Sequence, residues 1–192
     1  ISNNDFGVYV EANEISSLDI IDNKSEEGSA SVKGISDNSF AGIYIEANNA
    51  GTCESTSVNI ARNHILRNGT ESAGTSVAAI WINILQSCGR AVVIQGNTIN
   101  GGPSVTGDGV HIESGSTKIN MNWITKFVNG VVAKDPETEV HQNNIVGNSE
   151  YGVLVPEDAG FVTDKPEPDF VDATNNWWGA KSGPYHPQKN PD

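Results

Sequence analysis

The sequence predicts an all-β solenoid in which each coil consists of two or three short strands. Apolar and polar residues alternate in short runs bounded by Gly, Asn and Ser, and helical periodicity is hard to find. Two short phrases take turns along the whole chain. Hydrophobic residues make up 36% of the 192 residues, less than in a typical globular domain, which suits a thin core in an elongated fold.

The first phrase reads Gly, aliphatic, any residue, aliphatic, and it predicts one strand in each coil. Its six occurrences are "GVYV" from Gly7, "GIYI" from Gly42, "AIWI" from Ala79, "GVHI" from Gly109, "GVVA" from Gly130 and "GVLV" from Gly152. Because side chains alternate between the two faces of a strand, the first and third places after Gly are expected to point inward. The inward residues are then Val8, Val10, Ile43, Ile45, Ile80, Ile82, Val110, Ile112, Val131, Ala133, Val153 and Val155.

The second phrase is an alternating strand followed by Asn, usually with Ile two residues further on. The Asn column consists of Asn23, Asn63, Asn97, Asn122, Asn143 and Asn176. Asn tolerates the left-handed conformation that a sharp turn needs, and stacked Asn side chains can hydrogen-bond to one another. We therefore interpret this column as structural. Two sites, "NKS" at Asn23 and "NGT" at Asn68, match the glycosylation sequon, and Asn68 is the one expected in a loop.

A solenoid accounts for the unequal spacing of the two phrases. Hairpins would need two-residue turns between paired strands, and no helix-period segment fills the gaps as a βαβ fold requires. In a solenoid each strand pairs in parallel with its counterpart one coil away, at about 4.8 Å. Insertions of variable length then become loops at fixed corners and leave the stack undisturbed.

The two phrases resemble the repeats of right-handed parallel β-helix proteins of the pectin-lyase-like superfamily. The branch that they resemble includes NosD-like periplasmic proteins, carbohydrate-binding and sugar-hydrolase domains, and large surface proteins of bacteria and archaea. The tail "VDATNNWWGAKSGPYHPQKNPD" is similar to the "NNWWG…GP…NP" ending of many such surface β-helices. The resemblance implies a right-handed parallel β-helix of roughly six to seven coils over residues 1–179, followed by a Pro-rich tail over 180–192. It implies no single activity, because such folds host lyases, hydrolases, adhesins and accessory proteins.

The last coil of the predicted solenoid carries two neighbouring tryptophans. Trp178 falls where earlier coils have an isoleucine, such as Ile65 or Ile145. A solenoid end exposes apolar core and unpaired strand edges, so it needs a cap. We therefore expect Trp177 and Trp178 to act as cap residues rather than as a sugar platform.

The second and fourth places of the Gly phrase are expected to point outward and to form a strip along the solenoid. The two columns read Tyr9, Tyr44, Trp81, His111, Val132, Leu154 and Glu11, Glu46, Asn83, Glu113, Lys134, Pro156. Sugar rings stack on aromatic side chains, while carboxylates and amides bind hydroxyl groups. The strip therefore predicts a polysaccharide site formed by Tyr9, Glu11, Tyr44, Trp81, Asn83 and His111. The alternative is that Tyr and Trp are simply good strand formers that pair along a flat sheet, or that loops cover them.

Acidic residues of the same strip are candidates for catalysis. Glu11 and Glu46, one coil apart, would stand at about the 5 Å separation of a retaining glycosidase pair. Glu46 and Glu113, two coils apart, would approach the upper end of the inverting range. Asp108 in "GDGVHIES" resembles the Asp-bearing strands of β-helix sugar hydrolases. The candidate catalytic residues are therefore Glu46, Glu113 and Asp108, for a polysaccharide hydrolase or lyase, although stacked Glu side chains could instead bind Ca²⁺.

The net charge and the cysteine content limit which classes of partner and which cellular compartment are expected. The net charge of −13 disfavours nucleic acid, and no apolar run is long enough to span a membrane. The four histidines lack the spacing of a local metal site, so we expect no metal centre and no cofactor apart from possible Ca²⁺. Cys53 and Cys88 follow Gly-phrase strands at the same corner of successive coils and are expected to form a disulfide, the alternative being two free thiols. That bond favours a secreted, cell-surface or periplasmic protein.

Two classes of function therefore remain open from the sequence. One is a β-helix that binds, or binds and cleaves, polysaccharide or a cell-surface glycan along the outward strip. The other is a non-catalytic structural or adhesive surface module, or a scaffold without glycan activity. The sequence leaves the oligomeric state open.

Overall fold

The structure is a computed structural model, and it describes residues 1–13, 15–24, 34–48, 57–70, 77–85, 92–157, 159 and 171–179. Sixteen strands lie in three parallel sheets, and the described residues contain no helix. The first sheet contains β1 (Phe6–Ala12), β4 (Ala41–Asn48), β7 (Ala78–Leu85), β10 (Asp108–Ser114), β13 (Asn129–Ala133) and β16 (Tyr151–Leu154). The second contains β2 (Ser17–Ile21), β5 (Ser57–Ala61), β8 (Val92–Gln95), β11 (Thr117–Asn120) and β14 (Glu139–His141). The third contains β3 (Ile35–Ser36), β6 (His64–Leu66), β9 (Thr98–Asn100), β12 (Trp123–Thr125) and β15 (Asn144–Val146).

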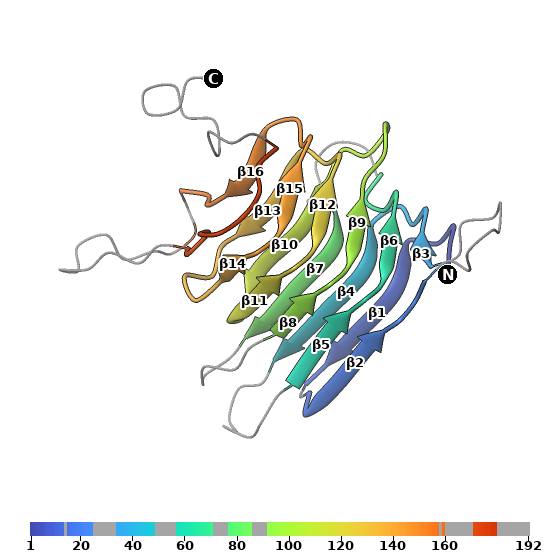
Figure 1. Cartoon of the computed structure of the whole chain (residues 1–192). Helices are drawn as coiled ribbons and strands as arrows, with labels where there is room; N and C mark the ends of the chain where they lie inside the picture. Colours follow the sequence, from blue (N-terminus) through green and yellow to red (C-terminus); the bar gives the residue numbers. More distant parts are fainter. Residues whose placement is uncertain are drawn as a thin grey trace.

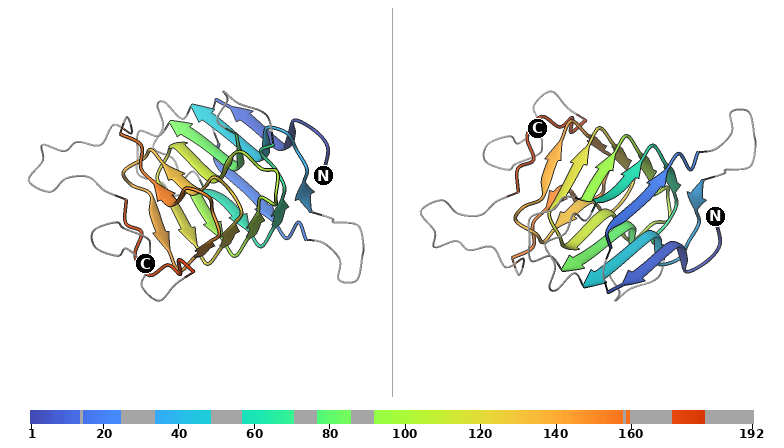
Figure 2. Two further views of the ribbon diagram at one scale, coloured as in Figure 1. Left: turned by 90° about the horizontal axis from the view of Figure 1, so that it is seen from above. Right: turned by 90° about the horizontal axis from the view of Figure 1, so that it is seen from below.

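Each coil contributes one strand to each sheet, so the chain forms the parallel β-helix that the sequence predicts. Figure 1 shows the strands stacked in chain order from the blue N-terminal coil to the orange and red C-terminal coil. The described residues form five complete coils. A sixth coil consists of β16 and the isolated bridges Glu139↔Asp172 and Asn144↔Trp177. Figure 2 shows the three sheets enclosing the interior of the stack. In the ranges described, no helix is long and apolar enough to cross a membrane.

The core consists of aliphatic columns that rise through the coils. The inward residues predicted from the Gly phrase are fully buried in the middle coils, as Ile43, Ile80 and Val110 illustrate at 0% exposure. The Ile two residues after the turn Asn is buried as well in four coils, at Ile65, Ile99, Ile124 and Ile145. Complete burial of one such side chain contributes about 1.5–3 kcal/mol, so these columns supply most of the stabilisation. The prediction is wrong for Val155, which is 40% exposed because β16 ends one residue earlier.

The glycine that begins each Gly phrase is required by close packing between coils. A Cβ at Gly109 would lie 2.5 Å from the carbonyl oxygen of Gly130 and 2.7 Å from the side chain of Ile124. The equivalent atom at Gly130 would lie 2.5 Å from the carbonyl oxygen of Gly152. The phrase therefore starts with Gly in these coils because the neighbouring coil leaves no room for a side chain, whereas the third coil accommodates the buried methyl group of Ala79.

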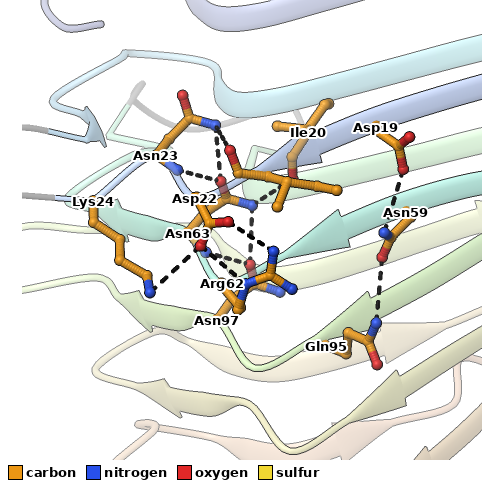
Figure 3. A network of polar contacts seen from close by, with 11 residues as sticks. Asp19, Ile20, Asp22, Asn23, Lys24, Asn59, Arg62, Asn63, Gln95 and Asn97 are labelled. Carbon is orange, nitrogen blue, oxygen red and sulfur yellow. Dashed lines mark hydrogen bonds and ion pairs between the residues drawn. The ribbon is translucent and has the colours of Figure 1, made fainter.

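The predicted Asn column is a continuous hydrogen-bonded ladder between the second and third sheets. Figure 3 shows its first rungs. Asn63 donates its backbone N–H (2.9 Å) and its Nδ2 (3.1 Å) to Oδ1 of Asn97, and its Nδ2 also donates to the carbonyl of Ile20 (2.8 Å). The same backbone and side-chain pattern continues through Asn97, Asn122, Asn143 and Asn176.

The turn geometry of the ladder differs from the expectation in one respect. The left-handed residue of each turn is the one that precedes the Asn, with φ between 55° at Met121 and 63° at Gly96. The Asn therefore holds the turn by its side-chain hydrogen bonds rather than by its own backbone conformation.

A shorter Asn ladder, which the phrases did not predict, occupies the corner between the third and first sheets. Asn38 donates its backbone N–H (3.0 Å) and Nδ2 (2.8 Å) to Oδ1 of Asn68, and Asn68 donates to the carbonyl of Ile35 (2.9 Å). Asn68 is 0% exposed. The expectation of an accessible loop sequon at Asn68 is therefore wrong, because its amide nitrogen is buried and already bonded.

The two tryptophans of the last coil have different positions. The bridge Asn144↔Trp177 places Trp178 in register with Ile145, and Trp178 packs against the core. Its ring lies over Gly152, where a Cβ would approach it to 2.6 Å. Trp178 thus has the position of a cap, whereas Trp177 points outward and is 48% exposed. The joint interpretation of both residues as a cap is wrong for Trp177.

Candidate functional site

The aromatic column of the outward strip lies on the first sheet in the predicted register from the first coil to the fourth. Tyr9 pairs with Tyr44, Tyr44 with Trp81, and Trp81 with His111. Ring centroids are 5.2 Å apart for Tyr9 and Tyr44, 6.2 Å for Tyr44 and Trp81, and 4.1 Å for Trp81 and His111, with interplanar angles of 10°, 26° and 7°. The four rings therefore stack face to face along the solenoid.

Stacking determines which parts of these rings a ligand can reach. Tyr9 is 50% exposed, Tyr44 and Trp81 are half-buried, and His111 is only 3% exposed. His111 does point away from the core, but the expectation that it is an exposed strip residue is wrong. Because neighbouring rings cover both faces of Tyr44 and Trp81, these two residues present mainly their edges outward.

Two phenylalanines extend the aromatic stack, and the sequence reasoning did not include them. The Phe6 ring lies 4.8 Å from Tyr9 and 5.3 Å from Tyr44, and the Phe40 ring lies 5.0 Å from Phe6 and 6.1 Å from Trp81. The sequence does contain a sign of these residues, because a Phe stands immediately before Gly7 and another stands two residues before Gly42. Each such pair contributes about 0.5–1.5 kcal/mol beyond its buried area, so the stack stabilises the first three coils.

The two tyrosine hydroxyls bind the carboxylates that follow them on the same face. Tyr9 donates to Glu11 at 2.6 Å, and Tyr44 donates to Glu46 at 2.7 Å. Burial, together with the Glu46 hydrogen bond, raises the pKa of Tyr44. Glu11 and Glu46 are in register on adjacent strands, and no ion pair joins either to another described residue. The described residues therefore leave two negative charges side by side.

These carboxylates line a pocket of about 570 Å³ at the C-terminal ends of β1, β4 and β7. The lining residues are Tyr9, Glu11, Ala12, Asn13, Glu46, Ala47, Asn48, Asn83 and Leu85. Asn83 donates to Glu46 at 3.5 Å, which makes a weak link between the second and third coils. The pocket thus combines two carboxylates, three amides and the exposed side chains of Tyr9 and Leu85, the latter 55% exposed.

A second polar cluster surrounds His111 one coil further on. The Nδ1 atom of His111 lies 2.9 Å from Asp108, and Nε2 lies 3.2 Å from Glu113. Asp108 also accepts a hydrogen bond from Asn129 at 2.8 Å, and Glu113 is 3.2 Å from Nζ of Lys134. Burial alone would raise the pKa of Glu113, but the hydrogen bonds from His111 and Lys134 outweigh it and lower the pKa.

A register shift separates Glu113 from the predicted carboxylate column. The pairing of β10 with β7 slips between Ile112 and Ser114, so that Ser114 lies opposite Asn83 and donates to it at 2.9 Å. The expectation that Glu113 continues the Glu46–Asn83 column is therefore wrong. A bulge of this kind re-aims one side chain, and here it turns Glu113 toward His111 and Lys134.

The three candidate catalytic residues consequently belong to two different surroundings. Glu46 faces the pocket together with Glu11, whereas Asp108 and Glu113 are both engaged by His111. Cleavage of a glycosidic bond needs two carboxyl groups on either side of one bond. In this arrangement the pair that shares a pocket is Glu11 and Glu46.

The remaining expectations concern metal binding, the disulfide and the tail. No group of three or more His, Cys, Asp or Glu side chains that could hold a metal ion occurs in the described ranges. The predicted disulfide between Cys53 and Cys88, and the Pro-rich tail over 180–192, fall outside the described residues. No family model matches the chain, and no curated protein or solved structure matches it either.

Proposed function

We propose that this protein is a carbohydrate-binding β-helix module whose pocket over β1, β4 and β7 holds a stretch of polysaccharide. The observation that carries the proposal is the pocket itself, which combines Glu11, Glu46 and Asn83 with the half-exposed ring of Tyr9. Carboxylates and amides bind hydroxyl groups at fixed positions, and hydrogen bonds to charged groups are among the stronger ones. The pocket spans three coils, which suits an extended chain that runs along the solenoid axis.

The charge of the pocket narrows the class of polysaccharide. Glu11 and Glu46 face the cavity, and the chain as a whole has a net charge of −13. A polyanion such as a polyuronate would meet like charges there, which disfavours it. We therefore propose a neutral polymer or one that carries amino sugars.

Binding without cleavage fits the surroundings of the candidate acids. Asp108 and Glu113 bind His111, and Glu113 has a cationic partner in Lys134. A general acid must hold a proton near neutral pH, and the lowered pKa of Glu113 opposes that role. The remaining route to hydrolysis is the pair Glu11 and Glu46, which we rank below simple binding because each already accepts a tyrosine hydrogen bond.

The parallel β-helix also supports a proposal about family and location. The repeats and the "NNWWG" ending resemble surface β-helices of the pectin-lyase-like superfamily, and we propose an extracellular or cell-surface site for the protein on that ground. The Cys53–Cys88 disulfide would agree with this location.

A pure scaffold is the second candidate, and a specific observation favours it. The stacked rings from Tyr9 to His111 cover one another and stabilise the sheet without any ligand. If the module is a scaffold, the aromatic strip is fully explained by sheet packing.

A glycan array followed by calorimetry distinguishes these candidates. We expect the wild type to bind neutral or amino-sugar polymers and Glu46→Gln to bind them about tenfold or more weakly, because one charged hydrogen-bond acceptor is lost. The matched control is Glu139→Gln on the second sheet, which removes a charge far from the pocket and should leave binding unchanged. Retained affinity in both Glu46→Gln and Glu11→Gln would overturn the proposed pocket. A reducing-end assay on the same proteins tests cleavage separately.

A further inference from the structure

The third sheet displays two exposed tryptophans on its outward face. Trp123 on β12 is 50% exposed, and Trp177 in the last coil is 48% exposed. Both pair with Asn144, so they occupy equivalent positions two coils apart, at about 9.6 Å along the axis. In the earlier coils the same column holds His64 and Thr98.

The solenoid itself does not require these indoles. Trp178 packs against the last coil of the core, whereas Trp177 points away from it. Trp123 stands at a position that Thr98 and Asn144 fill in the neighbouring coils. Large exposed apolar groups that gather on one face mark interaction sites more often than chance. Met121, which is 59% exposed, lies in the turn between β11 and β12.

The two indoles differ from the aromatic residues of the first sheet in one important way. On the first sheet each ring covers the face of the next. On the third sheet no ring contact involves Trp123 or Trp177 within the described residues. An amide-bearing residue, Asn144, separates them, so neither indole is used to cover the other.

The strands of the third sheet carry no formal charge. None of β3, β6, β9, β12 and β15 contains Asp, Glu, Lys or Arg, although such residues make up 18% of the chain. Toward the N-terminal end, the corners beside the same sheet hold the ion pairs Arg62–Asp22 and Arg67–Asp37. The exposed Lys126 lies at the corner directly after β12. The charges beside this sheet thus lie at its corners, and the uncharged outward face between them is suited, in an acidic protein, to an uncharged ligand.

The amide between the indoles has unused hydrogen-bonding capacity. Oδ1 of Asn144 is shielded from solvent and has no hydrogen-bond partner within the described part of the chain. The terminal torsion of an Asn side chain is broad, so the amide can turn toward an arriving hydroxyl group. Buried polar atoms are almost always paired in folded proteins, so an unpaired one calls for an explanation.

We propose that Trp123, Asn144 and Trp177 form a second carbohydrate site, which binds an uncharged polysaccharide running along the solenoid axis. The C–H faces of sugar rings are weakly positive and pack on the negative faces of the two indoles. The Asn144 amide exchanges hydrogen bonds with hydroxyl groups between them. This site lies on a different sheet from the Glu11–Glu46 pocket and does not depend on it.

The test uses cellohexaose, xylohexaose and mannohexaose as uncharged probes and polygalacturonate as the anionic comparison. Calorimetric titration of the wild type is expected to detect binding of at least one uncharged probe. Trp123→Ala and Trp177→Ala should each weaken it by about tenfold or more, as truncation of a central Trp does in other interfaces. The tryptophan variants should weaken binding by the same factor in the Glu46→Gln background, where the proposed pocket contributes little, which separates the new site from that pocket. Glu139→Gln on the second sheet lies outside both sites and should leave binding unchanged.

Control measurements keep every outcome decisive. Both tryptophans are exposed, so circular dichroism and the urea midpoint of the variants should match the wild type; Trp123→Phe and Trp177→Phe replace any alanine variant that unfolds. The proposal is overturned if none of the uncharged probes binds, if polygalacturonate alone binds, or if both tryptophan variants keep wild-type affinity. It is also overturned if sedimentation shows a dimer that the tryptophan variants abolish while sugar affinity stays unchanged, since the face is then an interface between copies.

Discussion

Replacement of Asn97 by Ala tests whether the Asn ladder holds the coils together. The Asn97 side chain accepts from the backbone N–H and Nδ2 of Asn63 and donates to Asn122 (2.9 Å) and to the carbonyl of Ile60 (2.8 Å). Alanine leaves the Asn63 N–H without its acceptor and the Ile60 carbonyl without this donor. A buried polar group that loses its partner costs about 1–3 kcal/mol, so the expected loss is about 2–6 kcal/mol.

Urea unfolding followed by circular dichroism measures this loss. Asn59→Ala is the matched control, because Asn59 lies on the outward face of the second sheet, where its hydrogen bonds to described residues are the long ones to Asp19 (3.3 Å) and Gln95 (3.5 Å). Its expected cost is within about 0.5 kcal/mol. An equal m-value in both variants would show that the same amount of structure unfolds. If Asn97→Ala costs no more than Asn59→Ala, the ladder does not stabilise the stack and the reasoning fails.

Three further predictions concern the cap, the corner ion pair and the glycine corner. Trp178→Ala should lower the free energy of unfolding by about 2–4 kcal/mol, since it uncovers the last coil, and thermal unfolding detects the loss. Arg67 donates two hydrogen bonds to Asp37, at 2.6 and 2.7 Å, and they lower the pKa of Asp37 in the folded protein. The stability that this pair contributes is therefore present above the ordinary Asp pKa of about 4. It is lost as the pH falls through the lowered pKa of Asp37 in the folded state. Asp37→Asn should therefore flatten the acid side of the plot of melting temperature against pH, and an unchanged slope would contradict this. Gly109→Ala should abolish soluble expression or lower the melting temperature sharply, because its Cβ would lie 2.5 Å from the carbonyl oxygen of Gly130.

The fold was predictable because its repeating constraints appear directly in the sequence. Alternating Ile and Val columns identify the inward face, and the recurring Asn identifies a turn whose hydrogen bonds repeat in every coil. The second ladder was missed because it has few rungs and no repeated phrase around it. Asn68 looked like an ordinary loop residue, and nothing in its neighbours indicated that Asn38 would pair with it.

The outward strip was predictable in register but not in accessibility. Strand alternation correctly places Tyr9, Tyr44, Trp81 and His111 in one column. Alternation cannot reveal whether the rings will stack on one another, because that depends on side-chain rotamers. It also cannot reveal the bulge that turns Glu113 toward His111, because the bulge falls after Ile112 and β10 ends at Ser114, so too few residues follow to show the change of phase.

The stacking of the first column changes which residues should recognise a ligand there. A sugar ring packs against an open aromatic face, and the faces of Tyr44 and Trp81 are occupied by neighbouring rings. Affinity in that pocket must then come mainly from Glu11, Glu46 and the amides, with Tyr9 as the exposed ring at the end of the stack.

Removal of the Trp81 ring would therefore disturb the sheet more than the ligand, so Trp81→Ala is a poor test of binding. Glu46→Gln is a better test of ligand binding, because it changes a group that faces the pocket and leaves the stacked aromatic rings intact. The third sheet presents the reverse arrangement, with exposed indoles and no charge between the corners. If both proposals hold, Glu46→Gln and a tryptophan substitution on the third sheet should each weaken sugar binding at a different site. Loss of a carboxylate weakens only the first site, and loss of an indole weakens only the second.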